Sequence, residues 1–220
     1  MTAQLGVEAV RAHPLARTVG VAGLVGTVVL FAGLIAGSPG EPPTDATTEA
    51  AAAFIRGLDV TWVRTAEVVA DIGMFVLLWF MVGLALLLRR VEGDVPLRST
   101  IAVLSSVLVA GFVILDSSEE AASRRATVLD RGQLAYAYDV TTVGFTNVWL
   151  PMGGFAFACG WVILSSGAMP RWLGWWGLVS GIALGLAQFA WTAPVAWLVP
   201  YGAFWAWLLA TCVLLVRRPT

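Results

Sequence analysis

Three ionisable side chains lie close together at the start of an otherwise apolar stretch. Arg64 precedes Glu67 by three residues, and Asp71 follows Glu67 by four. On a helix this spacing places the three side chains on one face. A charge at the centre of a bilayer costs about 2.5–3.5 kcal/mol on insertion scales, and less toward the ends of a span. Because residues this costly usually bind something, this face is the first candidate for a site.

Four further polar residues are expected at a similar depth, each near the same end of an apolar stretch: Asp116, Asp139, Asn147 and Gln188. With Arg64 as an internal counter-charge, converging helices would form an outward-facing polar pocket for a small ligand, a cation or a lipid head group. The alternative is that these are end-of-helix charges that reach water, together with one structural ion pair. That alternative explains Asp116 and Asp139 adequately.

Asn147 also lies beside an expected break in its helix. Pro151 has no N–H to donate to the carbonyl of Asn147, so the helix should kink there. Inside a membrane, a broken helix exposes backbone groups that can bind a ligand. The simpler interpretation, which we prefer, is a kink whose Asn147 side chain bonds a neighbouring helix.

Metal and cofactor chemistry finds no support in the sequence. The one histidine, His13, precedes the first apolar stretch, and the two cysteines, Cys159 and Cys212, lie inside apolar stretches. The chain contains no phosphate-binding P-loop, dinucleotide-binding glycine pattern, C-x-x-C or histidine metal pair. We therefore expect no metal and no cofactor. The net charge of −1 gives no reason to expect a nucleic-acid partner.

Glu119, Glu120 and Arg124 fit the pattern E-E-x-x-x-R. The pattern resembles the first motif of intramembrane proteases that cut after prenylated cysteines. In that family the glutamates work with histidines on later helices, and no histidine follows Arg124 here. The same spacing suits a Glu120–Arg124 ion pair on an exposed helix. We interpret the match to the protease motif as coincidence.

The elements that would position these residues are membrane-spanning helices. The chain is 59% hydrophobic and 12% charged, with a mean hydropathy of +0.83, whereas a soluble domain is about a quarter charged. An apolar helix needs about 20 residues to cross a bilayer. The sequence predicts one all-α domain, residues 1–220, with six transmembrane helices. They are expected near 18–37, 66–88, 99–115, 143–166, 172–191 and 195–216.

The distribution of arginine predicts the orientation. All 13 basic residues are Arg, which suggests a bacterial source with a GC-rich genome. With the N-terminus inside, eight arginines fall in cytoplasmic segments and five in outer ones. We expect both termini in the cytoplasm, at the inner (cytoplasmic) membrane of a bacterial cell. The long outer loops, 38–65 and 116–142, should contain short helices near 46–58 and 118–128, the second capped by Ser117.

Small residues predict where helices pack closely. Gly33 and Gly37 are four apart in the first span, and Gly177, Gly181 and Gly185 share one face of the fifth. Close approach through glycine drives helix association in lipid. We expect packing inside the bundle more than a dimer interface.

The first residues of two expected spans are weakly similar to each other. Arg17-x-x-Gly20-x-x-Gly23 opens the first span, and Arg171-x-x-Gly174-x-x-Gly177 opens the fifth. A parallel repeat would explain the match, and so in part would the preference for cytoplasmic arginine. Whether the duplication is real stays open.

One segment resembles a known group of proteins. Residues 169–178, Met-Pro-Arg-Trp-Leu-Gly-Trp-Trp-Gly-Leu, are similar to a recurring element of small six-span bacterial membrane proteins grouped as domains of unknown function. In those proteins a short inner loop ending in Pro-Arg-Trp-Leu-Gly leads into the fifth helix. With the hairpin that follows this loop, which matches only loosely, the likeness covers about a fifth of the chain. It implies the six-span topology without implying an activity.

Three functions follow as hypotheses. The first is binding or transport of a small ligand, ion or lipid through the polar pocket. The second is a structural or accessory subunit whose outer loops dock another membrane protein. The third is an intramembrane enzyme acting on lipid or isoprenoid substrates. It would need the carboxyl of Asp71 within about 5–9 Å of that of Asp116 or Asp139, by analogy with two-carboxylate catalysis. We leave enzymatic activity undecided.

Overall fold

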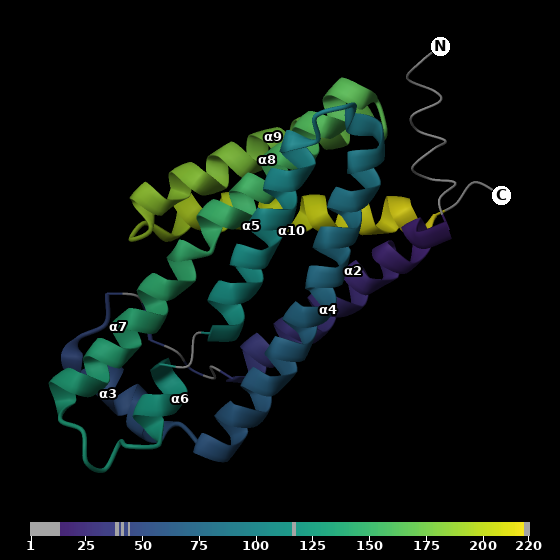
Figure 1. Cartoon of the computed structure of the whole chain (residues 1–220). Helices are drawn as coiled ribbons and strands as arrows, with labels where there is room; N and C mark the ends of the chain where they lie inside the picture. The colour runs from purple at the N-terminus through teal and green to yellow at the C-terminus, as the bar shows by residue number, and fades with distance from the viewer. Residues whose placement is uncertain (1–13, 38–39, 41, 44, 116–117, 218–220) are drawn as a thin grey trace.

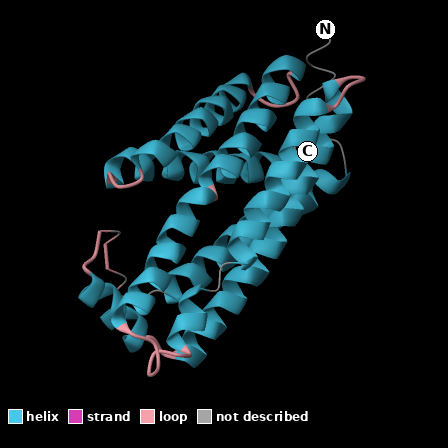
Figure 2. Ribbon diagram, turned by 60° about the vertical axis from the view of Figure 1, so that its left-hand side comes forward, coloured by secondary structure: helices cyan, strands magenta, loops and turns pink. Residues whose placement is uncertain are grey.

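The described part of the protein consists of helices joined by loops and turns, without strands. The computed structural model describes residues 14–37, 40, 42–43, 45–115 and 118–217, and every regular element within them is a helix (Figure 2). The α-helices are α2 (Pro14–Gly37), α3 (Thr48–Gly57), α4 (Val60–Glu92), α5 (Leu97–Leu115), α6 (Ser118–Ser123), α7 (Arg131–Asn147), α8 (Trp149–Ser166), α9 (Arg171–Ala187) and α10 (Pro194–Val216). A short 3-10 helix, η1 (Gln188–Ala190), follows α9.

Six helical stretches are long and apolar enough to cross a membrane. They are Leu15–Gly37, Val60–Glu92, Leu97–Ser123, Arg131–Ser166, Arg171–Ala190 and Pro194–Val216. This confirms the predicted all-α class and the predicted number of helices of spanning length. The last stretch begins at Pro194, one residue before the expected start at 195.

Local side-chain chemistry fixes several helix ends. Asp59 caps α4, with a side-chain oxygen 2.9 Å from the backbone nitrogen of Trp62. Gly167 ends α8 in the left-handed conformation, at φ 67°, which glycine adopts without the steric cost that other residues incur. These caps keep the connections between helices short.

The six long stretches form a closed ring. Going around it, each packs on the next in the order α2, α4, α5, α8, α9, α10, and α10 packs again on α2 (Figure 1). α3 and α6 gather with the first turns of α7 at one end of this bundle, which we call the α6 end (Figure 1). The opposite end carries the α4–α5 loop, residues 93–96, and we call it the loop end.

Glycine brings two pairs of ring helices into backbone contact. A Cβ added to Gly33 of α2 would lie 2.4 Å from the nitrogen of Ala70 on α4. A Cβ on Gly181 of α9 would lie 2.6 Å from the carbonyl oxygen of Gly153 on α8. Both distances are too short for a side chain, so the α2–α4 and α8–α9 pairs require glycine.

The other predicted packing glycines differ in the space that an added Cβ would find. A Cβ on Gly177 would lie 2.9 Å from Nε1 of Trp207 on α10, which is also a close contact. Gly37 and Gly185 have more room, since the nearest atoms to an added Cβ are at 3.4 and 3.8 Å. Close packing through glycine therefore extends to partners that the sequence patterns did not include, such as Gly153.

The α6 end carries a small cap with its own apolar core. α3, α6 and α7 contribute the buried residues Ala51, Ala52, Ile55, Ala122, Leu134, Ala135 and Tyr138. The hydroxyl of Tyr138 donates to the carbonyl oxygen of Pro42 at 2.6 Å. The helices expected near 46–58 and 118–128 are present as α3 and α6, although α6 ends at Ser123 and Ser117 lies outside the described residues.

The fourth long stretch differs most from its expected bounds. Helix begins at Arg131 rather than near residue 143, because Asp130 and Gln133 form a capping box, which the sequence reading missed. The interruption expected near Pro151 falls at Val148, between α7 and α8. The part of the outer loop beyond residue 130 is therefore helical.

The interior of the ring is filled unevenly. Toward the loop end, Phe80, Phe155, Phe204 and Trp207 are buried and fill the centre. The rings of Phe155 and Trp207 meet edge to face, with centroids 5.9 Å apart. Toward the α6 end, the same ring of helices encloses a cavity.

Candidate functional site

The cavity has a volume of about 220 Å³ and lies between α2, α4, α5, α6, α7, α8 and α10. Its walls are mostly apolar, and its charged lining residues are Arg64, Glu67, Asp71 and Glu119. Among the described lining residues there is thus one cation against three carboxyl groups. The structure therefore combines an apolar enclosure with an excess of acidic side chains.

α4 supplies the charged wall that the sequence predicts. Arg64, Glu67 and Asp71 all line the cavity, because their spacing puts them on one face of a continuous helix. Nη1 of Arg64 lies 3.9 Å from Oε2 of Glu67, which is a long ion pair. That carboxylate oxygen is buried and accepts no hydrogen bond from any described residue.

Asp71 is the least compensated charge in the cavity. It lies eleven residues after Val60, which is about 16 Å along the helix at 1.5 Å per residue. No described residue forms a salt bridge or hydrogen bond with its carboxylate. A carboxylate held in a half-buried position without a partner is costly. Asp71 therefore does not contribute to stability as an ion pair would.

Arg64 is engaged mainly by Glu120. The Arg64 Nη1 donates to Oε2 of Glu120 at 3.0 Å, and Arg124 donates to the other oxygen, Oε1. The side chain of Glu120 is only 7% exposed. Two arginines therefore neutralise Glu120, and this arrangement ties α6 to α4 across the end of the cavity.

The Glu120–Arg124 ion pair expected from the E-E-x-x-x-R pattern is confirmed. Its setting differs from the expectation, because Glu120 is buried rather than exposed. The adjacent Glu119 lines the cavity. Sequence reasoning did not include Glu119 or Glu120 in the site, because nothing in a six-residue helix indicates that it folds against α4.

Aromatic side chains form much of the remaining wall. Tyr201 and Trp205 of α10, Phe112 of α5 and Phe145 of α7 all line the cavity. The Tyr201 ring lies edge to face with that of Phe145 at 5.5 Å and with that of Trp205 at 6.0 Å. Tyr201 and Trp205 are four residues apart and therefore share one face of α10, but nothing in the chain indicates that this face meets α5 and α7 around a cavity.

The other predicted pocket residues lie elsewhere. Asp139 is exposed on α7 and does not line the cavity, and Asp116 lies outside the described residues. Asn147 and Gln188 meet each other instead, with Nε2 of Gln188 donating to Oδ1 of Asn147 at 3.4 Å. That hydrogen bond joins the end of α7 to η1, which agrees with the simpler interpretation of Asn147 as a bond between helices.

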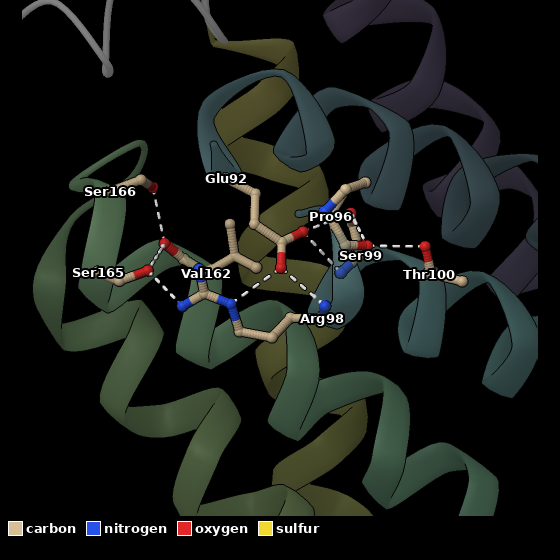
Figure 3. A network of polar contacts seen from close by, with 8 residues as sticks. All are labelled: Glu92, Pro96, Arg98, Ser99, Thr100, Val162, Ser165 and Ser166. Atoms are coloured by element: carbon tan, nitrogen blue, oxygen red, sulfur yellow. Dashed lines mark hydrogen bonds and ion pairs between the residues drawn. The ribbon is translucent and has the colours of Figure 1, made fainter. Parts of the chain in front are cut away.

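A second polar cluster, at the loop end, has a structural character (Figure 3). The carboxylate of Glu92 has 0% exposure, and its Oε1 accepts from the Arg98 backbone nitrogen at 2.7 Å and from Arg98 Nε at 2.9 Å. Its Oε2 accepts from the backbone nitrogen and the hydroxyl of Ser99. Arg98 also donates to Oγ of Ser165 at 2.8 Å and lies over the Trp161 ring.

This loop-end network leaves no acceptor oxygen of Glu92 for a ligand. It places a carboxylate at the start of α5, where an anion is favourable, and it connects α4, α5 and α8. The sequence analysis did not identify Glu92 as a structural residue. The two acidic sites of the bundle therefore differ, because one is fully bonded within the protein and the other is not.

The described residues contain no cluster of three or more histidine, cysteine or acidic side chains arranged to hold a metal ion. Cys159 and Cys212 are buried and free in different helices.

Comparison with known proteins found no family model, no curated protein and no solved structure that matches the chain. The resemblance of residues 169–178 to small six-span bacterial proteins stays a prediction.

Proposed function

We propose that this protein is a multi-pass bacterial membrane protein that binds a small molecule or a lipid group in the cavity, either as a receptor or as part of a transport cycle. Both termini lie in the cytoplasm, and the α6 end faces outward. Six helices of spanning length and the excess of arginine in the connections at the loop end support this arrangement. The α6-end cavity is then accessible from outside the cell.

The observation that carries the proposal is an acidic pair, Glu67 and Asp71, inside an apolar cavity. Asp71 has no described ion-pair partner, and Glu67, although it interacts with Arg64 and Glu120, keeps a buried Oε2 that accepts no hydrogen bond from any described residue. A carboxylate without a full ion-pair partner lowers the stability of the ligand-free protein, and a ligand of complementary charge offsets that loss when it binds. Pockets for drug-sized ligands measure about 300–1,000 Å³. A volume of about 220 Å³ suits a head group or a small molecule.

Substituted-cysteine accessibility tests whether water and solutes reach Asp71. Asp71→Cys and Ile72→Cys differ by one position on α4, but only residue 71 lines the cavity, while Ile72 is exposed on the outer surface of the bundle. In proteoliposomes, a water-soluble methanethiosulfonate reagent added from the α6 side should modify Asp71→Cys at least tenfold faster than Ile72→Cys. Both variants carry Cys159→Ala and Cys212→Ala to remove background.

Equal, slow reaction of both variants would mean that no water-filled cavity opens to the outside, and the binding proposal would fail. The reagent added from the opposite side provides the control for orientation. Faster reaction from that side would reverse the proposed topology while preserving the cavity.

An accessory-subunit function is the second candidate, and exposed apolar side chains on the cap favour it. Val128 is 76% exposed and Tyr136 is 70% exposed, both on the α6-end cap. If the cap docks a membrane-protein partner, a Val128→Asp/Tyr136→Asp variant should no longer co-purify a protein that the parent chain retains. Recovery of only a monomer from both chains in mild detergent would exclude such a partner.

The third hypothesis, an intramembrane enzyme, gains no support from the described geometry. It requires the carboxyl group of Asp116 or Asp139 close to that of Asp71, and Asp139 does not line the cavity. Asp116 lies outside the described residues.

A further inference from the structure

We infer that the cavity selects amphiphiles with an ammonium head group, which enters between Glu67 and Asp71 while the apolar chain leaves the bundle between α5 and α7. This inference rests on the proposed binding function and specifies its ligand class. Three features of the site carry it: the sign of the lining charge, the aromatic wall and the apolar exit.

The first feature is charge. Arg64, the cation among the described lining residues, already donates a hydrogen bond to Glu120 at 3.0 Å. The Glu67 carboxyl group interacts with the Glu120 side chain, but its buried Oε2 accepts no hydrogen bond from any described residue. Asp71 has no described ion-pair partner. A ligand cation would supply the missing charge, whereas an anion would add a third negative group beside Glu67 and Asp71.

The second feature is the aromatic wall. Phe112, Phe145, Tyr201 and Trp205 line the same cavity as the carboxylates. Aromatic faces attract organic cations, and alkylammonium groups in particular, through the negative charge density of the ring face. A small hydrated metal ion would gain little from apolar and aromatic walls, because hard cations prefer oxygen ligands. The mixed lining therefore fits an organic ammonium better than a metal ion.

The third feature is an apolar exit toward the outer surface of the bundle. Phe112 and Ile114 of α5 are 42% and 39% exposed, and Phe145 of α7 is 38% exposed. All three also line the cavity, so the cavity reaches the surface between these helices. Since about 220 Å³ cannot enclose a long alkyl chain as well as a head group, the chain would extend through this apolar edge into lipid.

The ammonium could belong to a free hydrophobic amine or to a zwitterionic lipid. Three probes with the same chain distinguish these sources: octyltrimethylammonium, octylphosphocholine and octyl sulfate. Saturable binding is measured by isothermal titration on the full chain in nanodiscs, with empty nanodiscs subtracted for partition into lipid. The variants are Glu67→Gln/Asp71→Asn and, as a matched control, Asp139→Asn, which changes an exposed acid that does not line the cavity.

We expect octyltrimethylammonium to bind at least tenfold more tightly than octyl sulfate. The double variant should lose at least tenfold in affinity for the ammonium probe, and Asp139→Asn should bind like the parent. Comparable binding of octylphosphocholine would identify a lipid source for the head group, and its exclusion would identify a free amine. Either result supports selection of ammonium.

Equal binding of the sulfate and ammonium probes, or unchanged ammonium binding by a correctly folded double variant, would overturn the inference. So would the absence of saturable binding by all three probes. Asp71→Cys accessibility separates these failures from failure of the proposed function. If that cysteine reacts rapidly while the probes do not discriminate, the cavity stands and the ligand class is wrong.

Discussion

Two acidic residues at the same end of the bundle should respond to neutralisation with opposite changes in stability. Glu120 is 7% exposed and bonded by two arginines, whereas Asp71 has no described partner. The variants Glu120→Gln and Asp71→Asn each remove one charge and preserve the shape of the side chain. Their effects on the free energy of unfolding therefore separate an acid that holds the fold together from one retained for a ligand.

The expected magnitudes follow from the two environments. Breaking a buried ion pair costs about 3–5 kcal/mol, and losing an exposed one costs about 0.2–1 kcal/mol. Arg64 and Arg124 are 52% and 57% exposed, so water partly replaces the lost carboxylate. We expect Glu120→Gln to destabilise the protein by about 1–3 kcal/mol. Asp71→Asn removes an uncompensated charge and should stabilise the empty protein by about 0–1.5 kcal/mol.

The measurement is equilibrium unfolding of purified protein in mild detergent, followed by tryptophan fluorescence, with Asp139→Asn as the surface control. Ligand-free protein is required, because a bound ligand would add its own stabilisation to the parent. If Asp71→Asn destabilises the protein as much as Glu120→Gln does, Asp71 is a structural residue and the reasoning for a binding site is refuted.

Three further predictions concern the rest of the bundle. Glu92→Gln should destabilise the protein by about 2–4 kcal/mol in the same unfolding assay, because it weakens a fully buried network; no change would show that α5 does not need this carboxylate. Gly181→Ala should destabilise by about 1–3 kcal/mol, since a Cβ there meets a carbonyl oxygen at 2.6 Å, whereas Gly202→Ala, with nothing within 4 Å, should be neutral or stabilising; equal effects would contradict the close α8–α9 contact. In intact cells, an impermeant thiol reagent should label Arg125→Cys at the α6 end, and should label Asp94→Cys in the α4–α5 loop only after permeabilisation; the reverse pattern would invert the proposed orientation.

Sequence reasoning predicted the long helices well because their signal is local. A run of about 20 apolar residues, the length needed to cross a bilayer, can be read directly from the chain. The helices α2, α5, α9 and α10 therefore begin and end within a few residues of their expected positions, apart from the additional first turn of α2. The start of α7 was missed, because the polar sequence before residue 143 does not look like a span and its capping box was not recognised.

The candidate site was predictable only where it lies on one helix. Arg64, Glu67 and Asp71 could be grouped because helical spacing alone places them on one face. Asp139 and Asn147 were grouped with them by depth, and depth does not determine which way a side chain points around a helix. Tertiary packing decided that, and it also brought Glu119 and the α10 aromatic residues to the cavity without any signal in the chain.

Protection of a cavity cysteine by bound ligand tests most directly whether the cavity is the binding site. Thr141→Cys places a thiol on the α7 wall of the cavity and leaves Arg64, Glu67 and Asp71 unchanged. We predict that saturating octyltrimethylammonium slows modification of Thr141→Cys by a water-soluble thiol reagent at least tenfold, and that octyl sulfate at the same concentration does not. An unchanged rate, under conditions where the ammonium probe is shown to be bound, would place the ligand elsewhere and contradict the account.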